Sequence, residues 1–150
     1  MKSAAIRKYI YLVFGIAILV TMYIITRPYT TSFKELVLDR VNVADITSIV
    51  IDKTKKGSTQ EEKIVVIDRK EIENIMNGFA EVELRESDFD NSSDSYWINI
   101  KVDGYIRFGL HLNEQNYINI FDRLRDDKYG NASYQIMNDF SQEFIGSLFN

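Results

Sequence analysis

The hydrophobic pattern divides the chain into one uninterrupted apolar stretch near the N-terminus and a longer region of short, alternating runs. Residues 9–25 read YIYLVFGIAILVTMYII and contain no charged residue. At a helical rise of about 1.5 Å per residue, this stretch together with Thr26 just covers the hydrocarbon core of a bilayer. Because no polar face interrupts it, the pattern predicts a transmembrane helix over residues 9–26 rather than a buried core helix.

The charges beside the apolar stretch indicate its orientation. Lys2, Arg7 and Lys8 precede it, and residues 1–27 contain no acid. Positive flanks favour the cytoplasmic side, so residues 1–8 are expected to form a cytoplasmic N-terminus. No small-residue cleavage site follows the stretch, which favours a signal-anchor over a cleaved signal peptide. We therefore expect a single-pass protein of the cell membrane with an extracytoplasmic C-terminal domain.

Residues 27–44 are expected to form a juxtamembrane linker or a short helix. Pro28 ends the membrane helix, and Phe33 and Leu36 begin an apolar spacing typical of a helix. The extracytoplasmic α+β domain is then expected to cover residues 45–150.

Alternation with a period of two is typical of strands and dominates the domain. Residues 96–103 and 105–112 form the clearest pair, because Asp103-Gly104 between two alternating runs predicts a tight hairpin turn. The residues expected to be buried in this hairpin are Ile98, Ile100, Ile106, Phe108 and Leu110. Further strands are expected at 46–51, 63–68, 81–85, 117–122 and 133–137.

Two helices are predicted to accompany these strands. Asp68 and Glu71 form the start of the first, and Ile72, Ile75 and Phe79 follow at helical spacing. The second is expected to start after residue 139. Strands joined by hairpin-length links predict an α+β fold, in which one or two helices pack on a mainly antiparallel sheet.

Composition and charge exclude several classes of protein. The 150 residues include no cysteine, so neither a disulfide nor a lipid-modified cysteine is available. Residues 28–150 contain 14 basic residues and 22 acids, a net charge of −8. Such a domain repels the phosphate backbone, so nucleic acid is not an expected partner.

No catalytic or cofactor-binding set is visible. His111 is the single histidine and has neither a cysteine nor a nearby serine nucleophile, so it supports no catalytic triad and no ordinary zinc site. We expect it at a surface or edge position. The glycines are scattered singly and form no phosphate-binding loop. These features predict a protein that is not an enzyme.

The stretch ESDFDNSSDSYW, residues 86–97, resembles the start of a calcium-binding loop. Asp88, Asp90 and Asp94 alternate as its first ligands would, but Ser93 replaces the glycine of the sixth position. Asn99 replaces the bidentate glutamate of the twelfth. We expect a solvated, mobile loop and no specific metal, with these three aspartates as weak candidate ligands.

Exposed aromatic residues are the other candidate for a site. Trp97 and Tyr105 occupy the strand positions opposite in phase to the apolar ones. They either form a binding surface or are covered by cross-strand neighbours and the closing helix, which is the commoner arrangement.

Three stretches carry a resemblance to a known group of proteins. They are DITSIVI at 45–51, DRKEIENIM at 68–76 and YQIMNDFSQEFIGSLF at 134–149. In this layout the chain resembles the small, mostly uncharacterised surface proteins of Gram-positive bacteria, which follow an N-terminal anchor with one α+β domain. The resemblance implies a location in the bacterial cell envelope and assigns no functional residues.

The expected function follows from the anchor and from the lack of a catalytic set. We expect an extracytoplasmic binding or regulatory module that acts by protein–protein contact, with the membrane bound through residues 9–26. The alternative is a cell-envelope enzyme, or a protein that sequesters a ligand or cation with its acidic surface. The oligomeric state remains open.

Overall fold

An eight-stranded antiparallel sheet forms the centre of the computed structural model, which describes residues 2–25, 28–58, 61–90 and 93–149, with side chains from residue 9 onward. The strands are β1 (Thr30–Ser32), β2 (Ile46–Thr54), β3 (Glu61–Val66), β4 (Glu83–Glu86), β5 (Ser95–Val102), β6 (Tyr105–Asn113), β7 (Tyr117–Asp122) and β8 (Asn131–Ile136). Their order across the sheet is β1-β4-β8-β7-β6-β5-β2-β3. The predicted α+β class with a mainly antiparallel sheet is confirmed.

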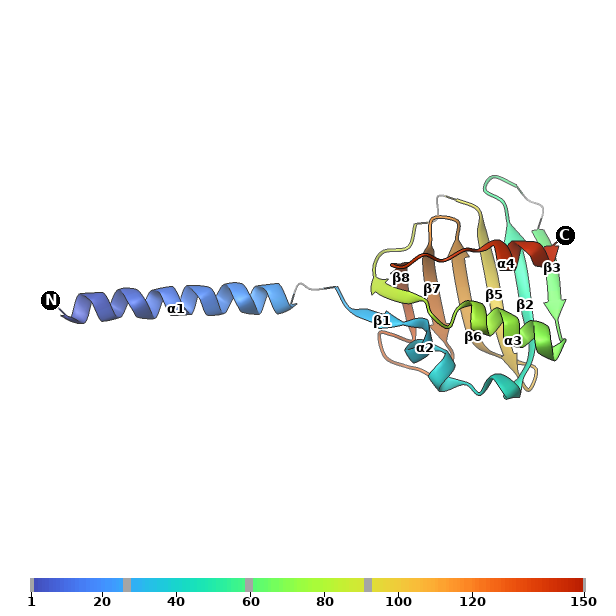
Figure 1. Ribbon diagram of the computed structural model, residues 1–150, viewed down its shortest axis with the longest axis horizontal. Helices are drawn as coiled ribbons and strands as arrows, with labels where there is room; N and C mark the ends of the chain where they lie inside the picture. Colours follow the sequence, from blue (N-terminus) through green and yellow to red (C-terminus); the bar gives the residue numbers. More distant parts are fainter. Residues whose placement is uncertain (1, 26–27, 59–60, 91–92, 150) are drawn as a thin grey trace.

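The helices of the domain cover one face of this sheet (Figure 1). They are α2 (Phe33–Leu36), α3 (Arg69–Gly78) and α4 (Glu143–Gly146), the last followed by a single 3₁₀ turn at Ser147–Phe149. Apolar residues at every second position of the strands face these helices, as a sheet covered on one side requires. The opposite face of the sheet, called the open face below, is described with the candidate site.

Both predicted helices form, but the second begins at a different residue from the one expected. At α3 the Asp68 carboxylate accepts hydrogen bonds from the backbone N–H groups of Lys70 (3.0 Å) and Glu71 (3.1 Å), which confirms the expected cap. The closing helix begins later than expected, because Gln142 rather than Asp139 precedes its first turn.

An aromatic cluster joins the helices to one another. The Phe79 ring, fully buried at the end of α3, stacks on Phe33 of α2 at 4.8 Å between ring centroids and on Phe140 at 5.3 Å. The edge of Phe144 from α4 meets the same ring at 5.5 Å. Such pairs add to the stability that comes from burying apolar area, so Phe79 links three separate segments of chain.

The folded domain begins earlier than residue 45. The described part of residues 27–44, expected to form a linker or a short helix, contains α2 but also β1, which pairs with β4 at the edge of the sheet. Ser32 caps α2 by accepting a hydrogen bond from the Glu35 N–H at 3.2 Å. Phe33 and Val37 are fully buried in the core. The segment is therefore part of the sheet and its core, because its partner strand lies far away in the sequence.

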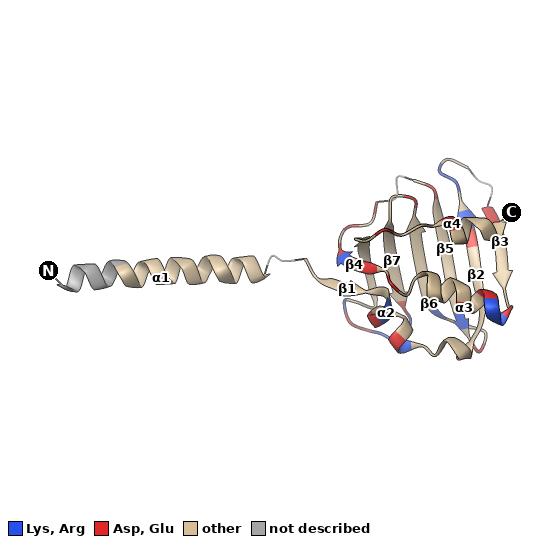
Figure 2. Ribbon diagram, viewed as in Figure 1, with Lys and Arg blue, Asp and Glu red and all other residues tan. Residues whose placement is uncertain are grey.

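Helix α1 (Lys2–Ile25) extends away from the sheet (Figure 1). The side chains of residues 9–25 are all exposed, and Figure 2 shows no charged residue in the part of the helix that it colours. Within the described residues, no helix has both the length and the apolar character needed to cross a bilayer. Thr26, which belongs to the expected span, and the side chains of residues 1–8 lie outside the described part of the chain.

The predicted hairpin of β5 and β6 is confirmed. Ile98 pairs with Leu110 and Ile100 with Phe108, and all four side chains are buried. Its turn requires two residues with positive φ, which Asp103 (52°) and Gly104 (82°) supply.

Ile106 departs from the expected pattern. The register of β5 and β6 shifts between Ile100 and Lys101, because β6 contains one additional residue, Arg107. This bulge reverses the phase of the strand, so Ile106 lies opposite Lys101 on the open face with 36% of its surface exposed. The prediction that Ile106 is buried is wrong for this reason.

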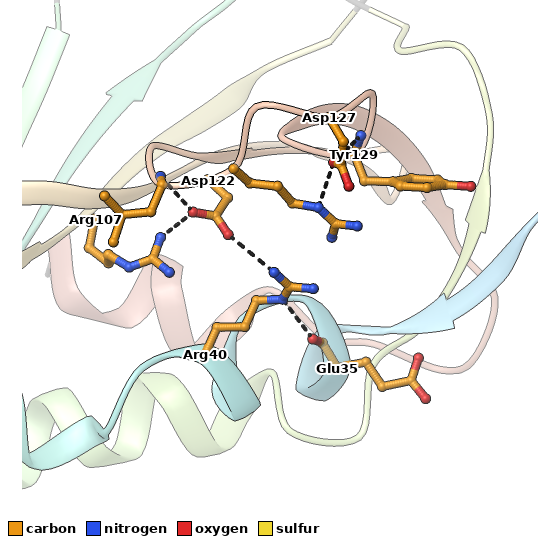
Figure 3. A network of polar contacts seen from close by, with 8 residues as sticks. Glu35, Arg40, Arg107, Asp122, Asp127 and Tyr129 are labelled. Carbon is orange, nitrogen blue, oxygen red and sulfur yellow. Dashed lines mark hydrogen bonds and ion pairs between the residues drawn. The ribbon is translucent and has the colours of Figure 1, made fainter.

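A buried carboxylate at the end of β7 joins the segment after α2 to the sheet (Figure 3). Asp122 is 3% exposed, and its Oδ1 accepts hydrogen bonds from the Arg107 guanidinium and from the Leu124 N–H at 3.0 Å. Its Oδ2 lies 3.7 Å from Nη1 of Arg40, whose Nε donates to the Glu35 carbonyl at 3.2 Å. Pairing of this kind is what allows a charge to be buried.

Replacement of the hairpin glycine tests the turn. We expect Gly104→Val to lower the free energy of unfolding by about 1–2 kcal/mol, because a β-branched side chain resists positive φ. Lys101→Val, at a strand position in the same hairpin, is the control and should change stability little. Denaturant unfolding measures both, and equal midpoints for the two variants would contradict this turn.

Removal of the buried carboxylate tests the Asp122 network. We expect Asp122→Ala to lower the free energy of unfolding by about 3 kcal/mol, since Arg107 and Arg40 lose the charge that pairs with them. Asp126→Ala removes an exposed carboxylate nearby and should cost no more than about 0.5 kcal/mol. If both variants shifted the unfolding midpoint by a similar amount, the Asp122 network would contribute no more to stability than an exposed carboxylate.

Candidate functional site: the open face of the sheet

The open face presents aromatic, apolar and amide side chains from the central strands. Register places Trp97, His111 and Asn119 in one row across β5, β6 and β7, and Asn99, Gly109 and Phe121 in the next. Trp97 is 48% exposed and Phe121 43% exposed. Exposed aromatic residues clustered on one face of a domain are typical of an interaction surface.

A stack of aromatic rings organises one end of this face. The Trp97 indole lies on the His111 imidazole with 3.9 Å between ring centroids and 13° between planes. The Phe89 ring, from the loop between β4 and β5, lies on the same imidazole at 4.4 Å. Burial lowers the pKa of His111, so the imidazole is neutral at neutral pH.

A hollow of about 480 Å³ lies beside the stack, within the size range of ordinary ligand sites. Gly109 contributes to its lining without a side chain; a Cβ there would lie 3.7 Å from the Asn99 Oδ1 and from the Phe121 Cβ. The residues lining the hollow are Trp97, Asn99, Ile106, Gly109, Asn119, Phe121, Arg123 and Asn131.

The amides of this hollow are held in a defined orientation. The Asn119 side-chain nitrogen donates to the Asn131 Oδ1 at 3.1 Å and to the Ser133 Oγ at 3.0 Å. These bonds use neither the Asn119 Oδ1 nor the Asn131 side-chain nitrogen. The hollow can therefore offer both an acceptor and a donor to a polar group.

A second hollow of about 320 Å³ is more apolar and shares Ile106 and Arg123 with the first. Its other lining residues are Val102, Tyr105, Arg107 and Leu124. Tyr105 is 71% and Leu124 75% exposed, so large exposed side chains border this hollow together with the two arginines. Neither hollow is lined by an acid among the described residues.

The acidic loop is held to the sheet by hydrogen bonds in its described part. Asp94 Oδ1 accepts from the Lys56 N–H at 2.8 Å, and the buried Asn113 side chain donates to the Asp90 carbonyl. Asp88 lines a separate polar hollow near β8. Residues 91 and 92 lie outside the described part. Among the described residues, no three potential metal-ligating side chains gather in one place.

Two expectations about single residues change with the structure. His111 lies on a central strand between two rings, not at an ordinary surface or edge position. Trp97 has the expected cross-strand neighbour, yet it is not covered by the closing helix, which packs on the other face. The sequence contains no local signal that Ile106, Phe121 and Arg123 share one site, because only the bulge and the strand order bring them together.

Comparisons with known proteins do not identify this chain. No family model matches it, and searches of characterised proteins and of solved structures found no significantly similar protein. Its function is therefore inferred from the arrangement of its own residues.

Fluorescence of the single tryptophan tests the ring stack. Protonation of a stacked imidazole quenches an indole, so we expect the emission of Trp97 to fall as the pH falls, with a midpoint below the ordinary histidine value of about 6.5. The His111→Gln variant should show no such transition. A midpoint at or above 6.5 would contradict the burial of the imidazole.

The lowered pKa of His111 also makes the stability of the domain depend on pH. Because the folded-state pKa of His111 is lowered, the unfolded chain binds more protons as the pH falls below about 6.5. The free energy of unfolding should therefore decrease from about pH 6.5 down to the folded-state pKa of His111, and His111→Gln should remove that contribution.

Proposed function

We propose that this protein is a membrane-anchored binding module whose open face contacts a protein partner outside the cytoplasm. The observation that carries the proposal is the exposed patch around Trp97, Phe121 and Arg123. Tryptophan, tyrosine and arginine are the residues that most often dominate the energy of protein interfaces. Trp97 and Phe121 lie on the central strands β5 and β7, where the backbone is fixed on both sides by neighbouring strands, and Arg123 directly follows β7.

The sequence and exposure of α1 support the anchoring part of the proposal. Residues 9–25 expose a series of large apolar side chains, whose contact with water is unfavourable and would be removed in a bilayer. With Thr26 they make 18 residues, near the lower end of the range of about 17–25 residues found in spanning helices. The basic residues Lys2, Arg7 and Lys8 favour a cytoplasmic N-terminus.

The anchor and the open face would act together. β1 follows α1 closely in the chain, so an anchored α1 would hold the sheet near the outer surface of the membrane. A domain held there is restricted to partners in or near the same membrane, which raises their effective concentration. This favours regulation of, or assembly with, another envelope protein over the capture of a freely diffusing protein.

Cross-linking on intact cells tests the proposal. The tagged full-length chain, treated with a reagent that does not cross membranes, should capture one membrane protein in stoichiometric amount. Trp97→Ala should lower the yield about tenfold or more, because truncation of a central aromatic in an interface typically costs 2 kcal/mol or more. Met137→Ala, which shortens an exposed side chain that lines neither of the two hollows, should leave the yield unchanged.

Two results would contradict the proposal. Equal capture by the Trp97 and Met137 variants would exclude the open face as the contact surface. Capture only by a reagent that crosses membranes would exclude the extracytoplasmic location.

A further inference from the structure

We propose that the open face selects a partner segment in which a large apolar side chain lies next to a carboxylate. This inference rests on the proposed function, since it specifies the chemistry of the protein partner. The smaller hollow is the observation on which it depends: apolar side chains surround it, and an arginine that it shares with the larger hollow lies at its margin.

The apolar part of the hollow suits one large side chain. Val102, Tyr105, Ile106 and Leu124 present hydrocarbon to a space of about 320 Å³, and three of these side chains are exposed. An aromatic or large aliphatic group entering this space would remove apolar surface from water on both partners. Arg107 and Arg123 complete the lining of the hollow.

Arg107 and Arg123 differ in whether their guanidinium groups are available to a ligand. Arg107 is committed to the buried carboxylate of Asp122, and its guanidinium also lies over the Phe108 ring at 4.2 Å. Arg123 is exposed, and its backbone N–H donates to the Arg107 carbonyl at 3.2 Å. Among the described residues, no side chain forms an ion pair or hydrogen bond with the Arg123 guanidinium. That group is therefore free to bind a carboxylate with its planar pair of donors.

The local charge favours an acidic ligand although the domain as a whole is acidic. Residues 28–150 carry a net charge of −8, yet the described lining of both hollows contains arginine and no acid. At physiological salt, charges separated by more than about 8 Å are largely screened, so the lining decides which side chain is accepted. A lysine or arginine of the partner would meet Arg123 without any carboxylate to compensate.

The chain itself places one segment of this kind on the open face. Phe89 lies between Asp88 and Asp90, and its ring packs on His111 in the same row as Trp97. The face therefore already accommodates an aromatic side chain flanked by acids. A partner segment with the same chemistry would occupy the neighbouring, unfilled part of the face, where Ile106 and Arg123 lie.

Titration of the full-length chain in nanodiscs of a neutral lipid tests the inference, with Trp97 emission as the readout. The probes are capped short peptides with one phenylalanine between two glutamates, two glutamines or two lysines. We expect the glutamate peptide to bind about tenfold more tightly than the glutamine peptide, and the lysine peptide to bind least. Arg123→Gln should bring the glutamate-to-glutamine ratio close to one without changing the affinity for the glutamine peptide.

A control and two contrary outcomes complete the test. Lys34→Gln removes the same charge from an exposed position on α2 and should leave the peptide preference unchanged. Equal affinity for the three peptides, or no binding of any, would overturn the inference. So would a larger response to an uncharged oligosaccharide, which would identify the face as a glycan site. If Trp97-dependent cross-linking persists while the acidic preference is missing, this inference alone fails and the proposed function stands.

Discussion

Burial of a single face of the antiparallel sheet is the constraint on which the rest of the structure depends. Every second side chain of β5, β6 and β7 is apolar and packs beneath α2, α3 and α4, so the backbone of these strands is fixed by the core. The alternate side chains project from the same rigid strands on the open face. The positions of Trp97, Asn99 and Phe121 relative to one another are therefore set by burial that takes place on the opposite side of the sheet.

The bulge in β6 links stability to the open face. One additional residue at Arg107 reverses the phase of the strand, which moves Ile106 from the core to the lining of both hollows. The same residue supplies the guanidinium that neutralises Asp122, and Arg40 joins that carboxylate from the segment after α2. The bulge therefore connects the segment after α2 with the apolar hollow, and bulges often occur near functional sites.

The sequence predicted local structure well and the composition of the open face poorly. Period-two alternation, the Asp103-Gly104 turn and the Asp68 cap are local signals, and each corresponds to a strand, turn or helix start in the structure. The pairing of β1 with β4 could not be predicted, because it joins residues about 50 positions apart through a polar run of three. Arg123 follows β7 in a polar, turn-like sequence, so only the register of β6 with β7 shows that it borders Ile106.

The position of β1 has a mechanical consequence. It is the first strand after α1, lies at the edge of the sheet and is held by three residue pairs to β4 alone. A pulling force between α1 and a partner bound to the open face would load these pairs before any other strand. Their rupture would release the residues of β1 as extended chain, at about 3.3 Å per residue. The next restraints are Phe33 and Val37, which are fully buried in the core, and after them the contact between Arg40 and Asp122. Strands β5, β6 and β7 would stay paired, so the domain could lengthen under tension while the open face keeps its contact with the partner.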